Sequence, residues 1–185
     1  MKNTFSLDEI SDWKKFQHLV ADYFQLGIGH EAKRSGIGPD GGKDIIVSAT
    51  VEDSVIPFKR KWVVQCKFYN TTVKLSDISS VNIPTLVHRH RANGYLLVCK
   101  DEVHNQIREM FDELNTGVCK MGYKYEIWDG SQFHTKMLML PSGPFFKKYF
   151  PEYQEFLAEQ EERMKEKKIK TMIREHGEPP EGGMQ

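Results

Sequence analysis

Apolar residues near the N-terminus recur at the spacing of a helix. They fall three or four positions apart and therefore line one helical face. These residues are Trp13, Phe16, Val20, Tyr23 and Phe24. Ser6 and Glu9, a hydroxyl followed three positions later by a carboxylate, match a capping box in front of this face. We therefore predict a first helix over 7–25.

Four shorter runs are rich in β-branched and aromatic residues, which is typical of strands. They span residues 44–51, 61–68, 95–99 and 123–128. Only a short connector with Pro57 separates the first two runs, so we expect them to pair as neighbours in one sheet. The run at 95–99 has almost no polar residue, which suits a strand covered on both faces.

Helical patterns separate these strands. Residues 76–77 can cap a helix that Pro84 is expected to kink or restart. Further helices are predicted at 102–115 and 131–139, and an aromatic segment closes the domain. The order of helix, strand, strand, helix, strand, helix, strand predicts an α/β fold with helices on the faces of a central sheet.

The composition changes near residue 151, and we predict three parts on that basis. A folded domain is expected over 1–150, and a disordered tail over 177–185. Between them, 151–176 is nearly all charged with few large apolar residues. This segment is interpreted either as a solvated helix or as a linker helix that runs into a further domain.

Charge and cysteine content narrow the class of protein only in part. The chain has 26 basic and 26 acidic residues, and this balance is mild evidence against strong non-specific DNA binding. Basic clusters at 59–61 and 88–91 still allow a local basic surface. No apolar run approaches the roughly 20 residues needed to cross a bilayer, so no membrane association is expected. The three cysteines form no CxxC pair, which suits reduced thiols in the cytoplasm.

The segment 27–44 is rich in glycine and predicts a loop or a tight turn into the next strand. It does not fit a phosphate-binding P-loop, because Asp44 follows Gly42 and Lys43 where that motif needs a hydroxyl residue. It does not fit a dinucleotide-binding motif either, since a strand follows where a helix is required.

The polar residues of the two paired strands carry the candidate chemistry. Gln65 and Lys67 are two positions apart on one strand and share a face, while Cys66 points the other way. Asp44 opens the preceding strand and can reach the same place. Asp44, the Gln65 amide oxygen and the Cys66 backbone carbonyl would suit Mg²⁺, with Lys67 stabilising charge on a phosphoryl group. The alternative is a structural ion pair between Asp44 and Lys67.

Two segments resemble a known family. Gly-Pro-Asp-Gly-Gly-Lys-Asp-Ile at 38–45 and Val-Val-Gln-Cys-Lys-Phe-Tyr at 63–69 are similar to the Mrr-type branch of the PD-(D/E)xK nucleases. The resemblance implies a restriction-endonuclease-like core with a central mixed sheet of four or more strands. It also implies a Mg²⁺-dependent DNA endonuclease, with Mn²⁺ able to substitute. Asp44 would be the metal ligand, Gln65 the residue at the acid position and Lys67 the catalytic lysine.

The chain departs from this family on the first helix. Many members carry a glutamate there that joins the metal site, and the equivalent residue in this chain is Gln17. This loss of a charge weakens the expected metal affinity, or the role passes to Glu31. Gln17 itself is either an accessory residue of the active site or a plain polar residue at the edge of the core. Asp40 is either a turn residue or a second ligand.

Three cations flank the proposed site, and they are candidate contacts for the phosphates of double-stranded DNA. Solvated loop charges are the alternative interpretation. These cations are Lys33, Arg34 and Lys43.

By analogy with similar domains, we expect the effector of a bacterial anti-phage protein, acting in the cytoplasm ahead of an NTPase sensor domain that this chain lacks. A homo-oligomer is a further expectation. Two other functions stay open. One is a nuclease-fold module that binds DNA or protein without cutting, and the other is a repair or junction-resolving nuclease.

Overall fold

The structure is a computed structural model that describes residues 4–35, 42–52, 55–116, 122–140 and 144–176. Its centre is a five-stranded sheet in the order β1-β2-β3-β4-β5. Neighbouring strands are antiparallel from β1 to β3 and parallel from β3 to β5, so the sheet is mixed. The strands are β1 Glu31–Arg34, β2 Ile45–Val51, β3 Phe58–Lys67, β4 Gly94–Cys99 and β5 Lys124–Trp128.

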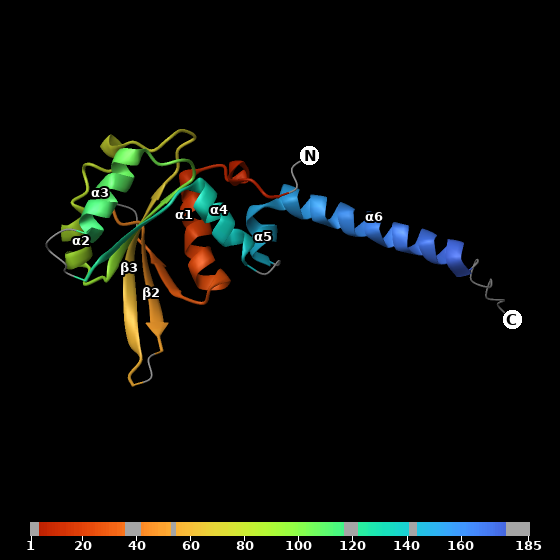
Figure 1. The fold of residues 1–185 in the computed structure, drawn as a ribbon, viewed down its shortest axis with the longest axis horizontal. Helices are drawn as coiled ribbons and strands as arrows, with labels where there is room; N and C mark the ends of the chain where they lie inside the picture. The colour runs from red at the N-terminus through yellow and green to blue at the C-terminus, as the bar shows by residue number, and fades with distance from the viewer. Residues whose placement is uncertain (1–3, 36–41, 53–54, 117–121, 141–143, 177–185) are drawn as a thin grey trace.

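Helices cover both faces of this sheet (Figure 1), which confirms the predicted α/β class. α1, α4 and α5 pack over one face, and α2 and α3 pack over the other. The α-helices are α1 Trp13–Asp22, α2 Ile83–Arg89, α3 Asn105–Thr116, α4 Gly130–Leu138, α5 Pro144–Tyr149 and α6 Pro151–His176. Short helical turns are η1 Leu7–Glu9, η2 Tyr23–Gly27 and η3 Leu75–Asp77.

The prediction of one continuous first helix was wrong. The capping box of Ser6 and Glu9 is present, but it begins only the three-residue turn η1. The chain is extended at Ile10, and Asp12 caps a separate helix by accepting the backbone N–H of Lys15. A second cap close behind the first therefore divides the helix. Trp13, expected on the apolar face, lies in the first turn of α1 with 54% of its surface exposed.

The pairing of the two strands around the candidate site is confirmed. β2 and β3 are antiparallel, with Ile45 opposite Val64. β1 was not predicted, because the segment before Asp44 shows no apolar alternation. It adds to the sheet at the edge of β2, with Arg34 opposite Ile45.

β4 is buried at all six positions, as its apolar run predicted. It is parallel to both of its neighbours, and a strand in that position needs cover on both faces. Gly94 begins it beside β5, where a Cβ atom would lie 2.3 Å from the carbonyl oxygen of Lys124. A side chain at residue 94 would therefore push these two strands apart.

The helix expected to begin at 76–77 restarts, as one of the two alternatives at Pro84 allowed. Residues 75–77 form only η3, and α2 begins later, with Asn82 as its cap and Pro84 in its first turn. Proline is tolerated there because the first turn leaves its N–H groups without helical partners.

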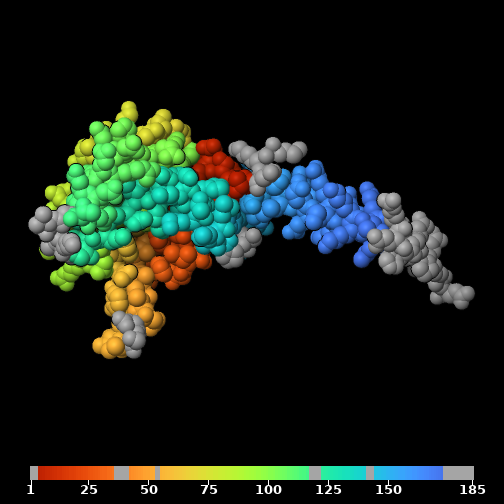
Figure 2. Space-filling model, in the orientation of Figure 1, coloured from red at the N-terminus to blue at the C-terminus, as the bar shows by residue number. Residues whose placement is uncertain are grey.

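α6 and the β2–β3 hairpin are the two projections of the molecule (Figure 2). The side chains of α6 are exposed from 161 to 172. The division of the chain into a domain, a linker and a tail stays a prediction, and 177–185 lies outside the described residues. Among the described helices, none is both long and apolar enough to cross a membrane.

Candidate active site

Asp44 lies directly before β2, and its carboxylate contacts residues of two other elements. One carboxylate oxygen accepts the side-chain N–H of Gln17 at 2.6 Å, and the other accepts the backbone N–H of Cys66 at 2.6 Å. Gln17 comes from α1, and Cys66 lies between the other two candidate residues on β3. The structure therefore brings the Asp44 carboxylate against the peptide that joins Gln65 to Cys66.

The backbone of β3 presents a carbonyl oxygen to the same edge. The carbonyl of Val64 accepts the N–H of Asp44 at 3.0 Å, and the carbonyl of Lys67 accepts the N–H of Lys100 at 2.9 Å. Successive residues of a strand thus bond to opposite sides, and the N–H and C=O of one residue point the same way. Because the N–H of Cys66 faces Asp44, its carbonyl faces that edge too.

The side chain of Cys66 belongs to the core and not to the site. Its thiol packs with the residues under α1 and α4. Burial raises the pKa of this thiol well above its usual value, and the charge of Asp44 raises it further. Thiolate chemistry at Cys66 is therefore disfavoured, and its backbone is the part available to the site.

Gln65 is a buried polar residue, with 5% of its surface exposed, on the sheet face covered by α2. Its amide oxygen accepts a hydrogen bond from the hydroxyl of Tyr95 on β4. Burial raises the pKa of Tyr95 well above its usual value, and the charge of Asp44 adds to this effect. The phenol therefore stays protonated and fixes the orientation of the Gln65 amide.

Sequence reasoning missed Tyr95, because its run was interpreted as a purely apolar strand. The parallel register places Tyr95 opposite Val63 and Leu97 opposite Gln65. Alternation along both strands then puts the tyrosine on the same face as the glutamine. A hydroxyl in a buried strand needs a partner, and that was the available signal.

Lys67 ends β3 on the same face as Gln65, and its side chain is half-buried. Its ammonium group donates to the backbone carbonyl of Asp77, in η3, at 2.7 Å. The sequence did not predict this contact, which depends on how the chain turns after β3. The turn holds the lysine side chain in place with one of the three donors that an ammonium group has.

Gly42 connects the glycine-rich segment to this site. Its φ of 87° lies in the left-handed region that favours glycine. A Cβ atom there would lie 2.4 Å from a methyl group of Val81 and 3.1 Å from the amide nitrogen of Gln65. The backbone can approach the Gln65 amide this closely only without a side chain.

The structure does not bring Glu31 to Asp44. Glu31 lies opposite Ser48, at the far end of β1 from Arg34, and forms an exposed ion pair with Lys59 at 3.7 Å. Asp40 lies outside the described residues. Within the described ranges, no cluster of three or more His, Cys, Asp or Glu side chains is arranged to hold a metal ion.

The three cations proposed to contact DNA lie in different surroundings. Arg34 comes close to His18 of α1 and, after burial, lowers the pKa of that histidine. Lys43 instead lies near His90, at the end of α2, and after burial lowers the pKa of that residue. Lys33 is exposed on β1, directly before Arg34 in the sequence.

A known protein family matches most of this chain. The restriction endonuclease family model Mrr_cat matches residues 7–137, which include all five strands, α1 to α3 and all of α4 except its last residue. A comparison with curated proteins finds no significant match.

Two solved structures are similar to this chain. The DNA modification-dependent restriction endonuclease AspBHI has 15% sequence identity and a TM-score of 0.46, covering 66% of this chain and 30% of its own. The MspJI restriction endonuclease in complex with a 27-mer oligonucleotide has 17% identity and a TM-score of 0.45, covering 65% and 26%. The chain thus spans less than a third of either protein. Because the family match covers more than half of the sequence, the chain belongs to the Mrr_cat family of restriction endonucleases, as its motifs predicted.

Proposed function

We propose that this domain is a Mg²⁺-dependent endonuclease that hydrolyses phosphodiester bonds of double-stranded DNA. Asp44, Gln65 and Lys67 would form its catalytic core. The observation that carries the proposal is the hydrogen bond from the Cys66 N–H to the Asp44 carboxylate. It joins the acid to the centre of the strand segment that bears the amide and the lysine.

The donor atoms at this site fit a hard cation. Mg²⁺ prefers oxygen ligands and is often held by only one or two carboxylates, with water and substrate phosphate completing its shell. Asp44 would supply the carboxylate, and Gln65 and the Cys66 carbonyl would supply neutral oxygens. Bound Mg²⁺ or Mn²⁺ would polarise the scissile phosphate and acidify a water molecule. Gln17 supplies an amide and not a second charge, which fits a weakly held ion.

The residues around these ligands perform separate tasks. Lys67, held by the Asp77 carbonyl, has further N–H donors for a phosphoryl oxygen or the attacking water. Tyr95 fixes the Gln65 amide, and Gln17 fixes the Asp44 carboxylate. Such groups, oriented before substrate binds, need little rearrangement during the reaction.

Supercoiled plasmid provides the direct test. We expect nicked and linear products with Mg²⁺ or Mn²⁺, and no cleavage by the same protein in EDTA. Agarose gels read at several times give the rates. Cleavage that is equally fast in EDTA would contradict the metal-dependent mechanism, and a lack of cleavage with both metals would contradict the endonuclease itself.

Gln17→Glu tests the departure from the family pattern. The change removes an N–H donor to Asp44 and places two carboxylates together, so one of them must take up a proton or share a cation. We expect the free energy of unfolding in EDTA to fall by about 2 kcal/mol. Because a second carboxylate strengthens a Mg²⁺ site, the Mg²⁺ concentration for half-maximal cleavage should fall about tenfold.

Gln25→Glu is the matched control, since Gln25 is exposed in η2 and the change in charge is the same. It should leave both quantities unchanged. Equal behaviour of the two variants in chemical denaturation and in Mg²⁺ titration would show that Gln17 does not belong to the site.

We further propose the biological setting expected from the sequence, an anti-phage effector in the cytoplasm. α6 would connect the nuclease to an NTPase sensor, and pairing of two copies would allow both strands to be cut. The support is the family membership and the exposed, charged surface of α6. Phage plaque counts in cells that express the full-length protein, with and without an intact Lys67, test this role.

A further inference from the structure

Four cationic residues and one histidine lie where α2 ends, and we call them the α2 corner: Lys43, Lys61, Arg89, His90 and Arg91. The ammonium group of Lys61 donates to the backbone carbonyl of His90 at 3.3 Å. Burial lowers the pKa of His90, and the nearby charges of Lys43, Arg89 and Lys61 lower it further. Segments from before β2, from β3 and from α2 therefore bring their positive charges together.

No ion pair between described residues involves a side chain of the α2 corner. The ion pairs within the described ranges use other cations, namely Lys59, Lys100, Arg108 and Lys148. The whole chain has equal numbers of acidic and basic residues. Cations that form no ion pair with a described residue give a local positive potential in a protein of zero net charge, and such a surface attracts a polyanion.

Arg91 occupies a position that is unfavourable for its backbone. Its φ of 49° is positive, and it is the only described residue other than glycine with this property. The N–H of Ala92 bonds to the carbonyl of Val87, and the N–H of Arg91 to that of His88, which is the helix ending that favours glycine. Arg91 is exposed, and no hydrogen bond or ion pair holds its guanidinium group among the described residues.

Interaction with the helix dipole does not explain this cluster. Cations in the last turn of a helix are stabilised by its carbonyl end. That effect applies to His88 and Arg89, but α2 has only seven residues, and Arg91 lies beyond its end. Lys43 comes from another segment altogether. A ligand outside the protein would explain both the unfavourable φ of Arg91 and the positions of Lys43 and Lys61 near His90.

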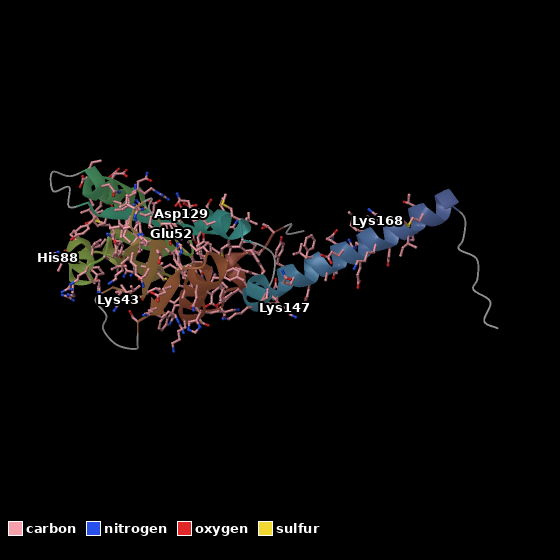
Figure 3. All side chains as sticks on the ribbon, turned by 90° about the horizontal axis from the view of Figure 1, so that it is seen from below. Lys43, Glu52, His88, Asp129, Lys147 and Lys168 are labelled. Carbon is pink, nitrogen blue, oxygen red and sulfur yellow. The ribbon has the colours of Figure 1, made fainter. Side chains whose placement is uncertain are left out.

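We propose that the α2 corner binds phosphate groups of the DNA duplex next to the segment that is cut. Lys43 directly precedes Asp44, so a strand seated at Asp44 passes this cluster. Figure 3 shows Lys43 and His88 at the same end of the molecule. The inference rests on the proposed function, because it takes DNA as the substrate. Charge complementarity selects the phosphate backbone, and the contacts are independent of sequence.

Arg91→Gly is the decisive variant, since it should change stability and binding in opposite directions. Glycine suits the positive φ, so the Tm should rise by about 2–4 °C. Loss of the charge should weaken binding to a short labelled duplex in EDTA about threefold to tenfold. The slope of log affinity against log salt should fall in magnitude by about 0.9 per lost contact. Adding Arg89→Ala to this variant should roughly double the decrease in the magnitude of the salt slope.

Lys168→Ala is the control, because Lys168 is exposed on α6, far from the corner (Figure 3), and the charge change is the same. The inference would be overturned if Arg91→Gly had the same DNA affinity and salt slope as this control. The α2 corner would then bind no ligand, or would bind an acidic protein. That result leaves the proposed function intact if the wild type cuts plasmid. Wild type that binds the duplex through the corner but never cuts would refute only the nuclease proposal, and wild type that neither binds the duplex nor cuts plasmid would refute both.

Discussion

Lys67→Ala is expected to slow plasmid cleavage by about a hundredfold to a thousandfold while the domain stays folded. The ammonium group ends β3 beside Gln65, and the Asp77 carbonyl holds it in one place. Charge that develops on a transferring phosphoryl group is stabilised most by donors already oriented toward it. Removing the side chain removes such a donor and leaves Asp44 and Gln65 as they were. Initial rates of nicking in Mg²⁺ measure this effect.

The control for this variant lies on the same strand. Lys59→Ala makes the same change in charge at the far end of β3, where the side chain is 70% exposed. It should cut at nearly the wild-type rate. Because the Lys67→Ala variant loses one hydrogen bond, the Tm of this variant should fall by only about 2–4 °C. Cleavage by Lys67→Ala as fast as that of Lys59→Ala would place the catalytic lysine elsewhere.

The part of the site that could be predicted from the sequence is the part built from local pattern. Two apolar runs joined by a short connector pair as neighbours, and the structure pairs β2 with β3. Alternation along β3 puts Gln65 and Lys67 on one face. Asp44 could be placed at the start of β2 because the apolar run begins directly after it.

The contacts that position these residues could not be predicted, because they connect distant segments. The hydroxyl of Tyr95 reaches Gln65 only in the parallel register of β3 and β4, which no short pattern specifies. The Asp77 carbonyl reaches Lys67 only because the chain forms η3 after β3. Both contacts use groups that a search for charged side chains overlooks, a phenol and a backbone carbonyl.

The choice between Gln17 and Glu31 shows the same limit. A carboxylate is the more obvious ligand, so sequence reasoning kept Glu31 as an alternative. β1 was not predicted, and only its pairing with β2 shows that Glu31 lies opposite Ser48. Gln17 lies near the middle of α1, one residue after the fully buried Phe16, and reaches Asp44 because α1 packs against the sheet. Tertiary packing therefore brings the amide and not the acid to Asp44.

Asp44→Asn is expected to have an even larger effect than the loss of Lys67, because it alters both the proposed cation site and the folded state. Among the described residues, one oxygen of the carboxylate accepts an N–H of Gln17 and the other accepts the N–H of Cys66. Asparagine has only one oxygen, so its NH₂ group must face one of these donors. Leaving a partly buried donor without an acceptor costs about 1–3 kcal/mol. The variant also lacks the only carboxylate among the proposed ligands.

We therefore expect Asp44→Asn to lose cleavage by more than about a thousandfold and to lower the free energy of unfolding by about 2 kcal/mol. Added Mg²⁺ should no longer raise its Tm, because ligand binding stabilises only a protein that retains the site. Asp112→Asn, on the exposed side of α3, makes the same charge change and should alter none of these quantities. Unchanged stability would show that the carboxylate does not join α1 to β3, and unchanged cleavage would mean that the reaction occurs at another site.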